Sequence, residues 1–271
     1  MVVSESQEIS LEVISLTNDV GRFLVSSLSE KLANPPVHTG QLQELHVQAL
    51  LHACMRGQTQ ASVVVHQWLA SGVDIEDVYL QGITPVARLV GQWWCDDDID
   101  FASATLAFVR LRQLVNELSP LFLLESASRK NGLSCLMVGN FQTQHTLGLF
   151  MLSEFFKRHG WQVRSDECDS GKDLLQMVSS DWHDLLAISL SCENQAEQMR
   201  RLIPYIRKNS ANPHLKIMAG GPLFSIQPHA VKNLGIEVMT HDARTAQKIA
   251  FDLVCPKQTS SQHELTLVNV N

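Results

Sequence analysis

The 271-residue sequence has no stretch that approaches about 18 uninterrupted apolar residues, so we expect no transmembrane helix. Its beginning, MVVSESQEIS, lacks a basic region followed by an apolar one, and we therefore expect no secretory signal. Lysine and arginine form no sustained run, and the formal net charge is −7. This balance argues against direct binding of nucleic acid through a basic patch, so we expect neither a nucleic-acid nor a membrane partner.

The sequence also lacks a Cys-x-x-Cys pair, although it contains six scattered cysteines. This pattern argues against a zinc site and against a disulfide framework. We expect buried, unreactive thiols and a cytoplasmic location, where cysteines stay reduced. The cysteines are Cys54, Cys95, Cys135, Cys168, Cys192 and Cys255.

Apolar residues recur at helical spacing through the first half of the chain. Residues 1–40 contain one amphipathic stretch, ended by Asn34-Pro35-Pro36, and we predict a helix followed by a tether. Over residues 41–127 the same spacing predicts four helices with short connections, which are typical of an antiparallel bundle. The third and fourth helices are predicted over about residues 74–94 and 101–124.

Short apolar runs alternate with helical patterns after Gly132, in a predicted domain over residues 132–255, followed by a mobile tail over 256–271. This alternation predicts an α/β fold, Rossmann-like, with a five-stranded parallel sheet. The predicted strands cover about residues 133–138, 161–163, 185–190, 215–219 and 236–239. The predicted helices cover about residues 146–159, 173–178, 196–208, 228–233 and 243–253.

Three short motifs fall at the carboxyl ends of predicted strands, where doubly wound sheets bind their ligands. His145 and Gly148 follow the first strand, and an imidazole there can ligate a metal while a glycine lets a bulky ligand approach the backbone. Ser189 and Ser191 end the third strand and offer small hydroxyl groups. Gly220-Gly221 follow the fourth strand and leave the main chain open to a ligand.

Together these motifs resemble the cobalamin-binding motif of the methionine synthase type, which reads D-x-H-x-x-G, S-x-L and G-G. Here 40 residues separate Gly148 from Ser189, and 28 separate Ser191 from Gly220, close to the spacing in that family. The resemblance implies that His145 is the metal ligand, replacing the dimethylbenzimidazole of the cofactor on the lower face of cobalt. It also implies that the displaced nucleotide tail passes along the motif residues. The implied cofactor-binding residues in this half of the chain are Thr143, Gln144, His145, Thr146, Leu147, Gly148, Ser189, Leu190, Ser191, Gly220 and Gly221.

Two residues depart from the family motif. Thr143 stands where the family has an aspartate that orients the imidazole, and Ser191 stands where it has a leucine. A threonine hydroxyl can orient an imidazole but carries no charge, so ligand switching linked to a proton is not expected.

The helical half extends the resemblance. Val90-Gly91-Gln92-Trp93-Trp94 is similar to the L-G-E-L-W segment in the helical cap of methionine synthase and of cobalamin photoreceptors. That similarity implies that Trp94 lies over the upper face of the corrin. Photoreceptors of the CarH type carry a Glu-His pair where this sequence has Ala104-Thr105, so the histidine ligand of the upper face is absent.

A tryptophan pair, a run of aspartates and then Asp100-Phe101 most resemble the AerR/PpaA antirepressors. The resemblance implies a light- or redox-responsive regulator of transcription that is not an enzyme and acts on a repressor of the PpsR/CrtJ kind. One alternative is a corrinoid carrier subunit of a methyltransferase. Another is a haem-binding sensor of the AppA-associated kind.

The remaining polar residues receive simpler interpretations. Residues 96–98 with Asp100 could form a metal site, but we favour a solvated loop in which Asp100 caps the next helix. Seven histidines outside the motifs are interpreted as solvated or capping residues: His52, His66, His159, His183, His214, His229 and His241.

Overall fold

The computed structural model forms two compact units that divide between Phe122 and Leu123. None of the helices in the described part of the chain is long and apolar enough to cross a membrane. The structure describes residues 41–124, 130–139, 147–168, 170–227, 229, 231–240 and 242–256.

The first unit is entirely helical. Its third predicted helix runs without a break from Ile75 to Cys95. The middle of this helix, Val78–Ile83, has π-helical hydrogen bonding. Just after it, the Thr84 hydroxyl donates a hydrogen bond to the Tyr79 carbonyl at 2.9 Å. The elements are α2 (Glu44–Arg56), α3 (Gln58–Ala70), α4 (Ile75–Asp77), η1 (Val78–Ile83), α5 (Thr84–Cys95) and α6 (Phe101–Phe122).

Aromatic packing and one arginine hold this unit together. The rings of Tyr79 and Phe122 stack with their centroids 4.4 Å apart, both fully buried. The Arg110 guanidinium on α6 donates to the Cys54 and Met55 carbonyls, at 2.6 and 3.0 Å. It thereby satisfies carbonyl groups near the end of α2 that have no partner inside the helix.

The capping role predicted for Asp100 is confirmed. Its Oδ1 accepts a hydrogen bond from the backbone N–H of Ser103 at 2.6 Å, in the first turn of α6. Hydrogen bonds from Ser103 hold the pKa of the Asp100 carboxyl below its usual value. The charged carboxylate is the better acceptor at the positive end of a helix.

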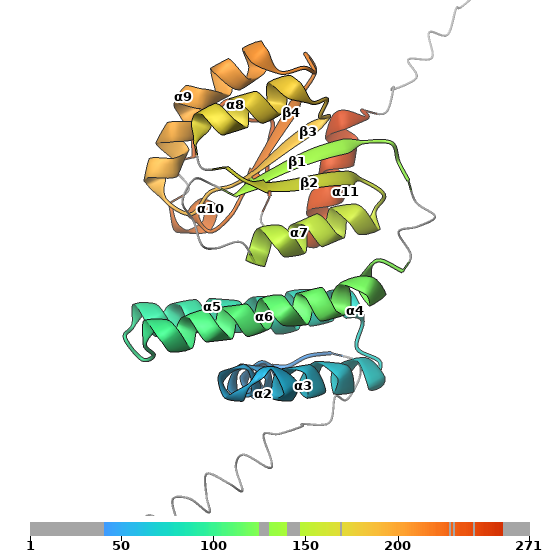
Figure 1. Cartoon of the computed structure of the whole chain (residues 1–271), viewed down its shortest axis with the longest axis vertical. Helices are drawn as coiled ribbons and strands as arrows, with labels where there is room; N and C mark the ends of the chain where they lie inside the picture. The colour runs from blue at the N-terminus through green and yellow to red at the C-terminus, as the bar shows by residue number, and fades with distance from the viewer. Residues whose placement is uncertain are drawn as a thin grey trace, which may run out of the picture. The chain divides into compact units, whose positions relative to one another are not determined.

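The second unit contains a five-stranded, fully parallel sheet in the order β2-β1-β3-β4-β5 (Figure 1). The predicted α/β class with its five-stranded parallel sheet is therefore confirmed. The order changes direction between β1 and β3, which creates a switch point where helices leave on opposite sides. The strands are β1 (Ser134–Gly139), β2 (Gln162–Glu167), β3 (Leu185–Ser189), β4 (Lys216–Gly220) and β5 (Val238–Met239).

Helices cover both faces of the sheet (Figure 1). On β1, Cys135 and Met137 pack with α7 and α11, whereas Leu136 and Val138 pack with α8 and α9. Alternate residues of each strand thus belong to opposite faces, which explains why these strands are continuous apolar runs. The helices are α7 (Leu147–Arg158), α8 (Gly171–Ser180), α9 (Glu193–Asn209), α10 (Leu223–Ile226) and α11 (Ala243–Val254).

The helix predicted over residues 228–233 is wrong where the structure describes it. Residues 229 and 231–233 form turns, and the short helix α10 comes earlier, directly after the Gly220-Gly221 pair. The backbone of Asn233 has a φ of 58°, a left-handed conformation that cannot continue a right-handed helix. Pro228 and Ala230 lie outside the described residues.

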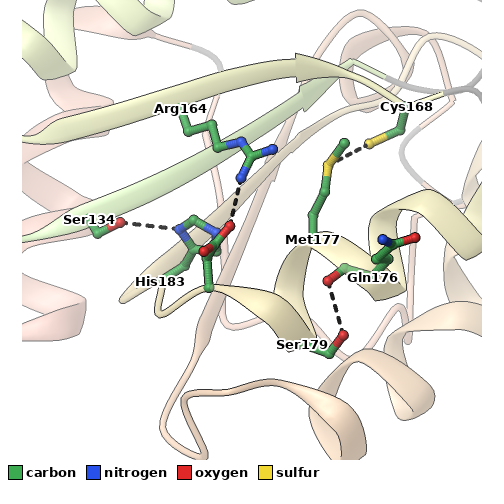
Figure 2. Close-up of polar contacts among 8 residues, drawn as sticks. Ser134, Arg164, Cys168, Gln176, Met177, Ser179 and His183 are labelled. Carbon is green, nitrogen blue, oxygen red and sulfur yellow. Dashed lines mark hydrogen bonds and ion pairs between the residues drawn. The ribbon is translucent and has the colours of Figure 1, made fainter.

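The prediction that the cysteines are buried is wrong for three of them. Cys95, Cys192 and Cys255 are exposed, because each lies at a helix end rather than on a packed face. For the remaining three it is confirmed, and burial raises the pKa of the Cys54 thiol to about 12. The buried thiol of Cys168 lies 3.5 Å from the Met177 sulfur (Figure 2).

His183 is also not the solvated residue that we expected. It is 4% exposed, and its Nδ1 lies 3.1 Å from the Ser134 hydroxyl at the amino end of β1 (Figure 2). Burial lowers the pKa of the His183 imidazole; the Arg164 guanidinium lowers it further, and the Asp181 and Asp184 carboxylates oppose both. The neutral imidazole is therefore the form that the folded unit prefers.

This lowered pKa predicts acid-sensitive stability. Below a pH of about 6.5 the unfolded chain binds a proton at His183 that the folded chain resists, so the free energy of unfolding should fall as the pH decreases. The fall should reach at most about 1.4 kcal/mol per pH unit from this group. Hydrogen exchange of the β1 and β3 amides at pH 7 and at pH 5 measures this free energy. His183→Gln should reduce the difference in the free energy of unfolding between the two pH values.

His214→Gln is the matched control, because His214 is exposed and, like His183, lies two residues before the amino end of a strand, here β4. An equal pH dependence in wild type and in His183→Gln would show that this imidazole does not resist protonation.

Candidate functional site

The carboxyl ends of three adjacent strands bring small residues into one row. Gly139 of β1 is the register partner of Ser189 of β3, which in turn is the partner of Gly220 of β4. All three follow the alternation of Cys135 and Met137, so they belong to the face of the sheet that α7 and α11 cover. The row lies at the switch point, where parallel α/β sheets bind ligands.

The first motif is described only in part. Thr143, Gln144, His145 and Thr146 lie outside the described residues. Leu147 and Gly148 form the beginning of α7, and Gly148 is exposed. A Cβ added to Gly148 would meet no atom of the described residues within 4 Å, so the packing of that part of the chain does not require a glycine there.

The second motif lies directly after β3. The Leu190 side chain is 1% exposed and belongs to the core beneath α8 and α9. Ser189 and Ser191 flank it and are half-buried. By strand alternation Ser189 belongs to the opposite face, the one that α7 covers, and Ser191 follows two residues after the end of β3. The Ser189 hydroxyl is therefore a polar group that the end of β3 presents on the α7 side.

The backbone N–H groups of this segment are already used. Leu190 donates to the Gly220 carbonyl at 2.8 Å. Ser191 and Cys192 both donate to the Gln195 side-chain oxygen, at 2.6 and 3.2 Å. A ligand at this edge can therefore be recognised by the serine hydroxyls but not by these N–H groups.

The third motif packs against the second, backbone to backbone. A Cβ on Gly221 would lie 2.4 Å from the Leu190 carbonyl oxygen and 3.0 Å from the Ser189 hydroxyl, and the φ of Gly221 is +109°. A Cβ on Gly220 would lie 2.8 Å from the Thr240 carbonyl oxygen. We expected these glycines to make room for a ligand, but the chain's own backbone already requires both of them.

Trp94 belongs to the helical unit, near the end of α5. It is 40% exposed, and its ring centroid lies 6.1 Å from that of Phe101. A partly exposed indole is available for contact with a ligand, whereas Trp68 in the same unit is 2% exposed and serves the core.

Gln195 is a residue that the sequence motifs did not reveal. Its signal was present, because a glutamine three residues after a helix N-cap is a capping-box pattern, and Cys192 is the N-cap of α9. The unusual N-cap residue concealed it, since serine, threonine, aspartate and asparagine are the usual N-caps.

The packing of Gly221 on Leu190 predicts a large cost for a single methyl group. Gly221→Ala should lower the free energy of unfolding by at least about 3 kcal/mol, because it adds overpacking to a strained backbone. Urea unfolding, monitored through the hydrogen exchange of the β3 and β4 amides, measures this loss of free energy of unfolding. The control is Gly235→Ala, which also has a positive φ, of +76°, but would meet only an Ile203 methyl group at 3.4 Å. That variant should cost roughly 1–2 kcal/mol, and equal costs for the two variants would contradict the steric argument.

This arrangement is similar to that of known proteins. Residues 135–250 match the model of the B12 binding domain family. The 20.5 kDa protein of the bchF-crtJ intergenic region of Rhodobacter capsulatus is 26% identical over 176 residues, which are 65% of this chain and 91% of that protein. The structure of the Methanosarcina barkeri monomethylamine corrinoid protein is similar, with a TM-score of 0.65 and 15% identity, covering 77% of this chain and 98% of that one.

The described residues fit a corrinoid. A corrin holds cobalt through its own ring nitrogens, so the protein need add only an axial ligand and a surface for the nucleotide tail. The open space at Gly148 and the hydroxyl groups of Ser189 and Ser191 suit such a tail. Residues 135–250 therefore match a cobalamin-binding fold, and cobalamin is the cofactor of this protein.

Proposed function

We propose that this chain is a cobalamin-binding regulator of transcription that acts through a repressor protein, with His145 as the lower axial ligand of cobalt. The observation that carries the proposal is the row of Gly139, Ser189 and Gly220 at the switch point of the sheet. The Ser189 hydroxyl in this row supports a channel for the nucleotide tail on the α7 side, leading toward Gly148, whereas the Cβ position of Gly220 is taken by the Thr240 carbonyl oxygen.

In this proposal each motif has its own task. His145, with Gln144, Thr146 and Leu147 beside it, holds the cofactor from below, and the Thr143 hydroxyl orients the imidazole. Gly148 gives the tail access to the beginning of α7. In the proposed channel Ser189 and Ser191 contribute hydroxyl groups, while the buried Leu190 and the backbone of Gly220 and Gly221 hold the serine segment in place.

Thr143 favours a sensor over a methyl carrier. A carboxylate hydrogen-bonded to a ligating imidazole raises its basicity and allows the pair to exchange a proton as the metal changes state. A neutral hydroxyl cannot do this, so the ligand stays in one protonation state. When bound, cobalamin would supply a metal centre whose upper ligand responds to light or to redox state. Trp94 is our proposed aromatic contact on that upper face, because it is exposed enough to meet a ligand.

The regulatory half of the proposal depends on the relative from the bchF-crtJ region. A shared origin with a protein encoded beside crtJ supports a repressor of the PpsR/CrtJ kind as the partner. The helical unit would respond to the cofactor by a shift between two arrangements, each of which makes different cofactor contacts.

A carrier subunit of a corrinoid methyltransferase is the second candidate. The fold shared with the monomethylamine corrinoid protein favours it. In that case the chain would also bind cobalamin and would also have no catalytic residue of its own, but its partner would be an enzyme. A haem sensor is disfavoured, because haem has no nucleotide tail to occupy the row of small residues.

The first test concerns the axial ligand. His145→Ala should weaken cobalamin binding by at least about 100-fold, because losing the metal-ligating side chain should cost more than losing a group that only hydrogen-bonds to it. It should also abolish the absorption spectrum of histidine-ligated cobalt. Titration of the purified chain with hydroxocobalamin, followed by visible absorption, measures both effects. His214→Ala is the control, since it removes an exposed histidine at the amino end of β4, away from the motif residues Ser189 and Gly220 at the carboxyl ends of the strands. Unchanged affinity together with an unchanged spectrum in His145→Ala would exclude this histidine as the ligand.

The second test separates the two functions. The cobalamin-loaded chain should release a PpsR/CrtJ-type repressor from its promoter DNA, and the cofactor-free chain and His145→Ala should not. Fluorescence anisotropy of labelled promoter DNA with purified repressor measures the release. If the loaded chain leaves the repressor on DNA but accepts methyl groups from a corrinoid methyltransferase, the carrier function is correct instead.

A further inference from the structure

A buried glutamine fixes the conformation of the serine segment. Gln195 lies in the first turn of α9 and is 6% exposed. Its Oε1 accepts hydrogen bonds from the backbone N–H groups of Ser191 and Cys192, at 2.6 and 3.2 Å. One side-chain oxygen thus holds two consecutive peptide groups at the point where β3 ends and α9 begins.

The same segment is held on its other side by the chain that follows β4. Leu190 donates to the Gly220 carbonyl at 2.8 Å, and Leu223 donates to the Leu190 carbonyl at 3.1 Å. Leu190 therefore has both backbone groups paired with one loop, while the two residues that follow it, Ser191 and Cys192, are paired with Gln195. Without Gln195, the peptides of Ser191 and Cys192 would lose their described partner and could rotate.

We infer that Gln195 is a positioning residue for the nucleotide tail of the cofactor: it sets the direction of the Ser191 hydroxyl in the wall of the tail channel. The inference depends on the proposed function, because it needs a tail in that channel. Gln195 itself does not contact the cofactor, since its oxygen is fully engaged by the two N–H groups and the side chain is buried.

Three substitutions test the acceptor oxygen. Gln195→Met keeps the length and buried volume of the side chain but removes the acceptor. Gln195→Glu keeps an acceptor and places the usual capping-box residue three positions after the N-cap. Gln198→Met is the matched control, because Gln198 lies on the same helix and is exposed.

The readout is the ratio of affinities for complete cobalamin and for cobinamide, which lacks the tail. Gln195→Met should lower the preference for cobalamin about tenfold and leave cobinamide affinity unchanged, while Gln195→Glu and Gln198→Met should keep the wild-type ratio within about threefold. Tenfold corresponds to about 1.4 kcal/mol. The Ser191 and Cys192 amides should exchange hydrogen faster in Gln195→Met, and Gln195→Glu should restore their protection.

The outcomes separate this inference from the function beneath it. A wild-type chain with no preference for cobalamin over cobinamide contradicts the tail channel, and the inference fails with it. A wild-type preference that Gln195→Met retains overturns the role of Gln195 alone. If Gln195→Met does not fold, Gln195→Asn makes the same comparison, because its oxygen is one methylene too short to reach both N–H groups.

Discussion

The contact between Gly221 and Leu190 is the constraint on which the rest of the site depends. The two backbones approach so closely that no side chain fits at Gly221, and Leu190 exchanges hydrogen bonds with Gly220 and Leu223. The loops after β3 and β4 are therefore one hydrogen-bonded body rather than two mobile connections. A ligand at this edge meets a surface whose shape exists before it binds, which reduces the ordering cost of binding.

Strand alternation then decides which groups that surface presents. Leu190 faces the core beneath α8 and α9, so Ser189, the last residue of β3, must face the side of α7. Because β1 lies beside β3, the beginning of α7 with Gly148 belongs to the same end and the same face. The order of the strands and a period of two residues thus bring together motifs that are 40 and 28 residues apart in the chain.

The sequence predicted what burial controls directly. Strands β1, β3 and β4 are apolar runs, and their predicted bounds lie within one residue of the observed bounds. Strand β2 is longer than predicted because it lies at the edge of the sheet, where exposed residues such as Arg164 and Ser165 follow no apolar pattern. His183 escaped prediction because a lone histidine carries no sign of burial. The fold places its Nδ1 beside the Ser134 hydroxyl and brings Arg164, which pairs with Asp181, near enough to affect its pKa.

The glycines of the motif are of two kinds: those that the fold itself requires, and those that the described packing does not require. Gly148 and Gly221 both belong to the motif, yet a side chain would meet open space at the first and the Leu190 backbone at the second. Sequence alone cannot separate these cases, because the need for a glycine depends on what its missing Cβ would meet in space. Gly221 is required by the fold with or without a ligand, so its presence says little about which cofactor is bound. Gly148 is not required by the described packing, and this makes it, with the two serine hydroxyls, the part of the described motif that a ligand explains best.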